Sequence, residues 1–67
     1  MFEIDAAEIR RLMFATKLNT VELEKKAGIS RATAAKVIRD GAKVKFFVIG
    51  KIADALNVDG NTLILNH

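Results

Sequence analysis

The 67-residue chain contains no cysteine, proline, tryptophan or tyrosine, and its single histidine is the last residue, His67. Without cysteine the chain forms neither a disulfide nor a thiolate metal site, which suits a reducing cytoplasm. A lone terminal histidine, with no carboxylate cluster nearby, provides neither a metal ligand set nor a general base. We therefore predict no metal, no cofactor and no enzymatic activity.

Long apolar runs are missing as well, and no secretory leader is expected. No stretch approaches the ~18 apolar residues that a membrane-spanning helix needs. The opening residues MFEIDAAEIRR place acids where a secretory signal places bases. No glycine-rich loop follows a strand pattern, so a nucleotide-binding phosphate loop is not indicated. These absences predict one small domain, residues 1–67, in the cytoplasm and without a membrane partner.

Positive charge is concentrated in the middle of the chain. Residues 31–51 hold six bases and one acid, Asp40, which gives a net charge of +5. Residues 1–9 carry a net charge of −3 and residues 52–67 a net charge of −2, against +3 for the whole chain. An anionic partner is therefore expected to approach the middle segment rather than the chain ends.

Residues 20–39, TVELEKKAGISRATAAKVIR, are typical of two short helices joined by a tight turn. Asn19 is suited to cap a helix that begins at Thr20. Gly28 can adopt positive φ and turn the chain sharply, and Ser30 can start the next helix. Two helices joined by a short turn that contains glycine constitute a helix-turn-helix.

The second of these helices has two unlike faces. At about 100° per residue, Ala34, Val37 and Ile38 fall on one side. The other side combines bases with alanines and has no acid before Asp40, whereas an ordinary solvated helix mixes acids with bases. Such a face is flat enough for close approach to a nucleic-acid groove; a merely solvated basic face is the alternative. Its members are Arg31, Ala32, Ala35, Lys36 and Arg39.

The stretch LNTVELEKKAGISRATAAKVIRDG, followed by KIADALNVDGNTLI, resembles the lambda-repressor-like helix-turn-helix family of Cro/CI and XRE type bacterial and phage regulators. The resemblance covers about residues 5 to 65. It implies an all-α, five-helix DNA-binding domain whose recognition helix, about residues 31–39, enters the major groove. It also implies a homodimer on a pseudo-palindromic operator in double-stranded DNA.

The resemblance assigns contact roles residue by residue. The positions expected to meet base edges are Arg31, Ala32, Ala35 and Lys36. The positions expected to meet phosphates are Thr20, Ser30, Thr33, Arg39, Lys43 and, with weaker support, Lys45. Arginine or lysine can contact the guanine O6/N7 edge, and alanine the thymine methyl group, whereas phosphate contacts fix register without reading sequence.

Three departures from the family pattern stand out. Thr20 occupies a position where the family often has glutamine. Val44 and Lys45 replace the proline and serine that often precede the fourth helix, which predicts a poorly capped start. Many members join an arginine late in the first helix to a glutamate late in the recognition helix, but the matching residues here are Met13 and Ile38. Apolar packing is therefore expected in place of a partly buried ion pair.

The hydrophobic pattern predicts five helices. The first spans about Ala6 to Lys17 after an Asp5 N-cap, and Gly41 ends the third. The fourth spans roughly Lys45 to Asn57, and Asp59 caps a short fifth helix that ends near Ile64. The expected core comprises Ile9, Leu12, Met13, Thr16, Leu18, Leu23, Ile29, Val37, Phe46, Ile49, Ile52, Ala53, Leu56 and Leu63.

Two aromatic residues, Phe14 and Phe47, fall outside the core stripes. Either a terminal segment folds over one of them, or they mark a subunit interface. The segments Phe2–Ile4 and Leu63–Leu65 look extended enough to pair as a short terminal strand pair.

The sequence thus predicts a sequence-specific DNA-binding transcriptional regulator, a repressor of phage or mobile-element type. The alternative is an antitoxin or antirepressor that acts mainly by binding a protein partner, which Phe14 and Phe47 would favour.

Overall fold

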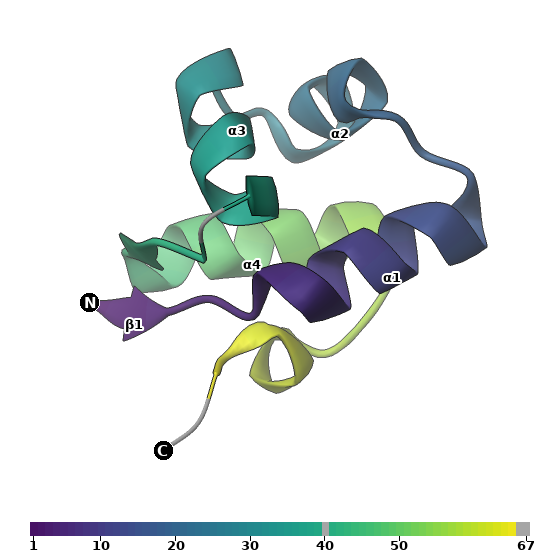
Figure 1. The fold of residues 1–67 in the computed structure, drawn as a ribbon. Helices are drawn as coiled ribbons and strands as arrows, with labels where there is room; N and C mark the ends of the chain where they lie inside the picture. Colours follow the sequence, from purple (N-terminus) through teal and green to yellow (C-terminus); the bar gives the residue numbers. More distant parts are fainter. Residues whose placement is uncertain (40, 66–67) are drawn as a thin grey trace.

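The structure, a computed structural model, describes residues 1–39 and 41–65. Asp40, the one acid of residues 31–51, and the terminal His67 lie outside these described residues, as does Asn66. Within the described ranges the chain forms four α-helices, one short 3-10 helix and two short strands (Figure 1). In chain order these are β1 (Phe2–Glu3), α1 (Ala6–Thr16), α2 (Thr20–Ala27), α3 (Arg31–Arg39), β2 (Lys43–Val44), α4 (Phe46–Leu56) and η1 (Gly60–Leu63).

Local capping sets the bounds of α1 and α2 as the sequence predicts. The Asp5 carboxylate accepts a hydrogen bond from Glu8 N at 3.1 Å. Asn19 and Glu22 form a reciprocal capping box at the start of α2, in which each side chain accepts from the other residue's backbone N–H. Lys17 ends α1 and Gly28 ends α2, both in the left-handed conformation that terminates helices.

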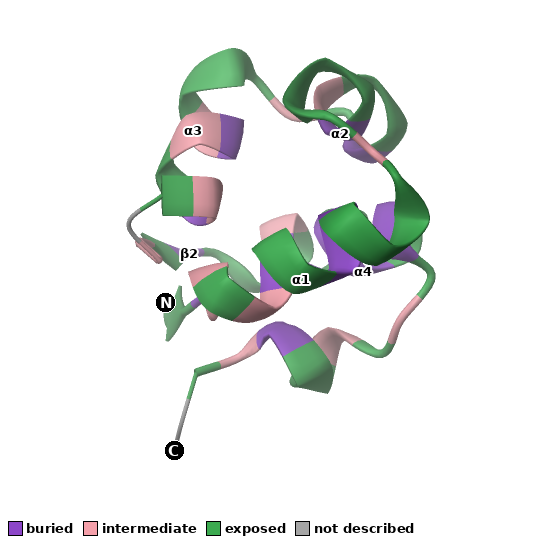
Figure 2. Cartoon of the chain, turned by 45° about the vertical axis from the view of Figure 1, so that its right-hand side comes forward, coloured by how far each residue is buried: buried purple, intermediate pink, exposed green. Residues whose placement is uncertain are grey.

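The helices enclose one apolar core. In both views α2 and α3 lie on one side of α1 and α4, and η1 lies on the opposite side (Figures 1 and 2). Side chains from all four helices, β2, η1 and the segment before α1 fill the space between them. The core expected from the sequence does not include four of these buried residues, Ile4, Ala27, Val44 and Ala55. The cluster consists of Ile4, Ile9, Leu12, Met13, Leu23, Ala27, Val37, Val44, Ile49, Ile52, Ala53, Ala55, Leu56 and Leu63.

The prediction of a fifth α-helix is wrong. The segment after Asp59 forms only the four-residue 3-10 helix η1. Asp59 does cap it, because its carboxylate accepts from Asn61 N at 2.9 Å. The next residue, Ile64, is already extended, and it forms an antiparallel bridge with Ile4. The pairing with Ile4 draws the chain into an extended path, so the helix stops after a single turn.

The predicted pairing of Phe2–Ile4 with Leu63–Leu65 is present as a single bridge, and β1 has a second partner, β2, that the sequence did not predict. β1 pairs antiparallel with β2, with Phe2 opposite Val44 and Glu3 opposite Lys43. The carboxyl-terminal segment joins on the other side of the first strand through the Ile4–Ile64 bridge and a Leu65 N to Glu3 O hydrogen bond of 2.8 Å. The first residues therefore lie between the chain that follows α3 and the chain that follows η1.

Two residues predicted to be buried are exposed. Thr16 lies on the surface, where its hydroxyl donates to Leu12 O at 2.8 Å and so needs no partner in the core. Phe46 is 70% exposed. It is the first residue of α4, and its ring packs against Phe2 of β1, with ring centroids 5.9 Å apart. Ile49, one turn later, takes the core position instead.

The start of α4 lacks a side-chain cap, as predicted, since Lys45 at the N-cap position forms no such hydrogen bond.

Candidate nucleic-acid interface

The start of α3 is built from neighbouring residues. Gly28 has φ +67°, and a Cβ there would meet no atom within 4 Å. Ser30 Oγ accepts from Thr33 N at 3.1 Å and donates to Thr33 Oγ1 at 3.0 Å. The turn and the cap predicted from the sequence are thus both present. A segment of six residues fixes where α3 begins.

The two faces of α3 differ as the sequence predicts. Ala34 and Val37 are buried, and Ile38 is half-buried against the core. On the opposite face Arg31, Ala32, Lys36 and Arg39 are exposed and Ala35 is half-buried. Figure 2 shows exposed residues along the outer side of this helix. The bases and alanines therefore share one solvent-facing surface that a groove could accommodate.

The remaining predicted contact residues flank this surface in the chain. Thr20 is exposed at the start of α2, Ser30 is exposed at the start of α3, and Thr33 is half-buried in its first turn. Lys43 in β2 and Lys45 before α4 are both exposed. Each hydroxyl or ammonium group that sequence analysis assigned to a phosphate thus belongs to a residue with solvent access.

Within residues 1–39 and 41–65, no ion pair neutralises the bases of this surface. Among residues 1–39 and 41–65 the one ion pair joins Arg11 Nη2 to Glu8 Oε2 at 2.7 Å, within α1. The hydrogen bonds from Arg11 hold the pKa of the Glu8 carboxyl below its ordinary value and raise the pKa of Arg11. In that same part of the chain, no side-chain hydrogen bond involves Arg31, Lys36 or Arg39. Their positive charge is available to an anionic ligand.

The end of α3 is held by residues from the beginning of the chain. Arg10 Nη1 on α1 donates to the backbone oxygen of Ile38 at 2.5 Å. Ile4 N donates to Ala42 O at 3.3 Å. Gly41 has φ +62°, as predicted for a residue that ends the helix, and a Cβ there would lie 2.8 Å from Ile4 O.

Sequence analysis did not identify Arg10. The available signal was its spacing: Arg10 lies one turn before Met13, so both project from the same side of α1. Met13 is the residue that replaces the family's arginine. An arginine lost at one position and present one turn earlier could have drawn attention to this contact.

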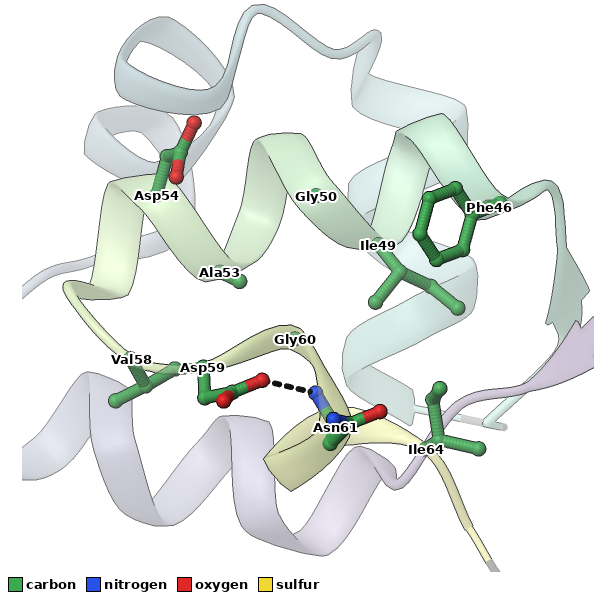
Figure 3. A pocket seen from close by; sticks show the side chains of 10 residues that line it. All are labelled: Phe46, Ile49, Gly50, Ala53, Asp54, Val58, Asp59, Gly60, Asn61 and Ile64. Carbon is green, nitrogen blue, oxygen red and sulfur yellow. Dashed lines mark hydrogen bonds between the residues drawn. The ribbon is translucent and has the colours of Figure 1, made fainter.

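A second surface lies between α4 and η1. A groove of about 240 Å³ runs between α4 and η1, and its walls include Phe46, Ile49 and Ile64 (Figure 3). Neither terminal segment covers the two predicted interface residues. Phe14 is 88% exposed. Phe47 is 56% exposed and lies beneath the Lys51 ammonium, 5.4 Å from the ring centroid.

In the part of the chain that the structure describes, no group of three or more histidine, cysteine, aspartate or glutamate side chains is placed to hold a metal ion. No helix in the described ranges has both the length and the apolar character needed to cross a membrane.

Comparisons with known proteins agree with this geometry. The chain is similar in structure to the restriction-modification controller protein C.AhdI from Aeromonas hydrophila, with a TM-score of 0.77 and 26% sequence identity. The match covers 85% of this chain and 86% of that one. No curated protein sequence matches the chain. Residues 8–64 match the family described as the Cro/C1-type HTH DNA-binding domain. This match begins in the first turn of α1 and extends past η1, and the chain belongs to that family of DNA-binding regulators.

Proposed function

We propose that the protein is a sequence-specific transcriptional repressor of phage or mobile-element type that reads the major groove with α3. The observation that carries this proposal is the exposed face of α3, in which bases alternate with alanines. Alanine leaves the helix narrow, so the backbone can approach the groove floor, while arginine and lysine reach beyond it to base edges. An ordinary solvated face would contain acids that pair with these bases.

The proposed base contacts are Arg31, Ala32, Ala35 and Lys36. Arg31 and Lys36 are suited to the guanine O6/N7 edge, and Ala32 to the thymine methyl group. Arg31 lies at the start of α3, the end that enters the groove in other helix-turn-helix proteins. Ala35 is half-buried, which fits a residue that lies near the groove floor without reaching into it.

The proposed phosphate contacts surround the base contacts, and their roles differ in strength. Lys43 and Arg39 bring full charges to the backbone. Ser30 and Thr33 offer hydroxyl donors, which also share one hydrogen bond with each other. Thr20 and Lys45 complete the set.

We further propose that the chain binds as a homodimer to a pseudo-palindromic operator. Half-sites of such dimers are separated by about one helical turn of DNA. Repression would follow from occupancy of a promoter. The similarity to C.AhdI supports a regulatory role but leaves this chain's own target genes to be found by selection.

A protein-binding role, as an antitoxin or antirepressor, is the second candidate. Phe14 favours it, because an aromatic side chain that is 88% exposed is typical of a contact surface. Co-purification of a protein partner at one-to-one stoichiometry, lost in Phe14→Ser, would support this role. A chain that selects DNA and co-purifies with no partner would exclude it.

Selection from a random pool of duplex DNA at about 0.15 M salt tests the main proposal. The wild type is compared with the double variant Arg31→Ala, Lys36→Ala, and with Lys25→Ala, Lys26→Ala as a control that removes equal charge from α2. We expect the wild type and the control to enrich a two-fold symmetric motif and the α3 variant to enrich none. Salt-sensitive binding without enrichment by the wild type would refute sequence-specific reading.

A further inference from the structure

The carboxyl end of α3 is connected to α1 by a single arginine. Arg10 Nη1 donates to Ile38 O, which lies 28 residues later in the sequence. Ile38 is the penultimate residue of α3, so its carbonyl is one of the last four that have no N–H partner within the helix. A cation at this end also interacts favourably with the helix dipole. Arg10 thus satisfies an orphan carbonyl and complements the local charge.

The contact shares one position, Ile38, with the ion pair that many family members form between the positions of Met13 and Ile38. Met13 is buried and Ile38 packs against the same core cluster, so neither side chain carries charge across the α1–α3 contact. Arg10 lies one turn before Met13 and reaches the backbone, not the side chain, of Ile38. A polar contact between α1 and the end of α3 is therefore still present. Its donor is Arg10 instead of an arginine at position 13, and its acceptor is a backbone oxygen instead of a glutamate side chain.

The adjacent arginine makes no such contact. Arg11 Nε and Nη2 both bond to the Glu8 carboxylate at 3.0 and 2.7 Å. That pair lies within α1, three residues apart, and 64% of the Arg11 side chain is exposed. Arg10 and Arg11 thus carry the same charge on the same helix, but of the two only Arg10 donates a hydrogen bond to α3. The chain itself provides a matched control.

We propose that Arg10 is a positioning residue for DNA reading, which sets the angle of α3 by holding its carboxyl end against α1. This inference rests on the proposed function, since it assigns to Arg10 an effect on how α3 reads bases. It assigns no direct contact between Arg10 and DNA.

The length of α3 explains why its angle matters. Nine residues rise about 13 Å at 1.5 Å per residue. A tilt of about 10° then displaces one end by roughly 2 Å relative to the other, and a hydrogen bond to a base edge tolerates only a few tenths of an ångström. Phosphate contacts made by long lysine side chains adapt to such a shift. Loss of the Arg10 contact should therefore reduce specific binding and leave non-specific binding almost unchanged.

The test measures affinity for the selected operator and for a scrambled duplex of equal composition, over a series of salt concentrations. In Arg10→Ala we expect the ratio of the two affinities to fall about threefold to tenfold, as for loss of one typical hydrogen bond, with an unchanged salt slope. Arg11→Ala should keep the wild-type ratio within about twofold, because exposed ion pairs contribute little. Arg10→Lys should recover part of the ratio, since an ammonium retains donors and charge.

A spectroscopic measurement tests the contact without DNA. The ¹³C chemical shift of the Ile38 carbonyl should change in Arg10→Ala and stay constant in Arg11→Ala. If Arg10→Ala does not fold, Arg10→Gln keeps the start of the side chain without its reach, and the same fall in ratio and the same carbonyl shift are expected.

Three results would overturn the inference or its basis. An unchanged affinity ratio in a selective protein would refute the role of Arg10 and leave the proposed function standing. Equal weakening on both duplexes, with a salt slope lower by about one unit, would make Arg10 a phosphate contact. A wild type that selects no duplex would refute the proposed function itself, and the Ile38 carbonyl shift would still show whether Arg10 holds α3.

Discussion

The two ends of α3 are fixed by different means. Its start depends on Gly28, Ser30 and Thr33, which lie within six residues of one another. Its end depends on Arg10 and on Ile4, which approach from the beginning of the chain. The two glycines that flank the helix show the same contrast. Both have positive φ, but Gly28 is surrounded by open space and Gly41 lies against the Ile4 carbonyl.

This contrast has a consequence for binding. The start of α3 carries Arg31, and its end leads to Lys43, which pairs with Glu3 of β1 across the strands. The reading end of the helix is therefore specified locally, whereas the position of Lys43 depends on the amino-terminal segment. Changes near residue 4 should affect the flanking contacts more than the reading end.

The largest expected effect compares the two glycines. Gly41→Ala combines a left-handed conformation with a Cβ 2.8 Å from a backbone oxygen, and we expect it to lower the unfolding free energy by about 3–4 kcal/mol. Gly28→Ala meets no atom and should cost about 1–2 kcal/mol. Urea unfolding with unchanged m-values measures both. Equal costs at the two sites would show that the clash with Ile4 is relieved by a small shift.

The next effect distinguishes a residue proposed to contact a base from one proposed to contact a phosphate. Arg31→Ala should reduce discrimination at one base pair by about 1–3 kcal/mol and leave other positions unchanged. Lys43→Ala should weaken binding to every duplex and flatten the salt slope by about one unit. A panel of single-base operator variants at several salt concentrations distinguishes them. The same pattern from both variants would contradict this division of contacts.

A smaller effect concerns the cap at the start of α3. Ser30→Ala removes the acceptor for Thr33 N and should cost about 1 kcal/mol of stability. Ser30→Asp keeps an acceptor and should retain stability, but its negative charge should weaken DNA binding. Thermal unfolding and duplex titration of the two variants measure both properties. Strong DNA binding by Ser30→Asp would place Ser30 away from the phosphates.

The smallest effect belongs to the Glu8–Arg11 pair. Because Arg11 lowers the pKa of Glu8 in the folded state, the pair stabilises the fold above the ordinary glutamate pKa. That contribution is lost as the pH falls through the lowered pKa. Glu8→Gln should therefore make the melting temperature slightly less sensitive to acid between about pH 5 and 3. An altered operator preference in Glu8→Gln would contradict the view that this pair acts within α1 and does not influence how α3 binds DNA.

The sequence predicts the four α-helices well because each carries its own signals. Asp5, Asn19 and Gly28 occupy the caps expected of them, and the apolar spacing in α3 separates its buried and exposed faces correctly. These features depend on residues within one turn of each other, so a pattern along the chain reveals them.

The errors arise where distant segments meet. Two-residue strands such as β1 and β2 have no periodicity of their own, so the partner of Phe2 was not predictable. Periodicity placed Phe46 on the core side of α4, but its position at the helix start leaves it against Phe2. Arg10 was missed because its acceptor is a backbone oxygen, which no sequence pattern marks. The contact roles of Arg31 and the other site residues remain predictions.

The single ion pair among the described residues joins Glu8 and Arg11, one turn apart on α1. Added salt therefore screens few attractive interactions that stabilise the folded chain. The cluster of bases on α3 and β2 responds in the opposite way, because displaced counterions dominate its interaction with DNA. Ionic strength should thus change the affinity for DNA much more than the stability of the fold. A titration with sodium chloride should release the chain from DNA while its melting temperature stays almost constant, and bound chain can be recovered folded from a nucleic-acid column by salt alone.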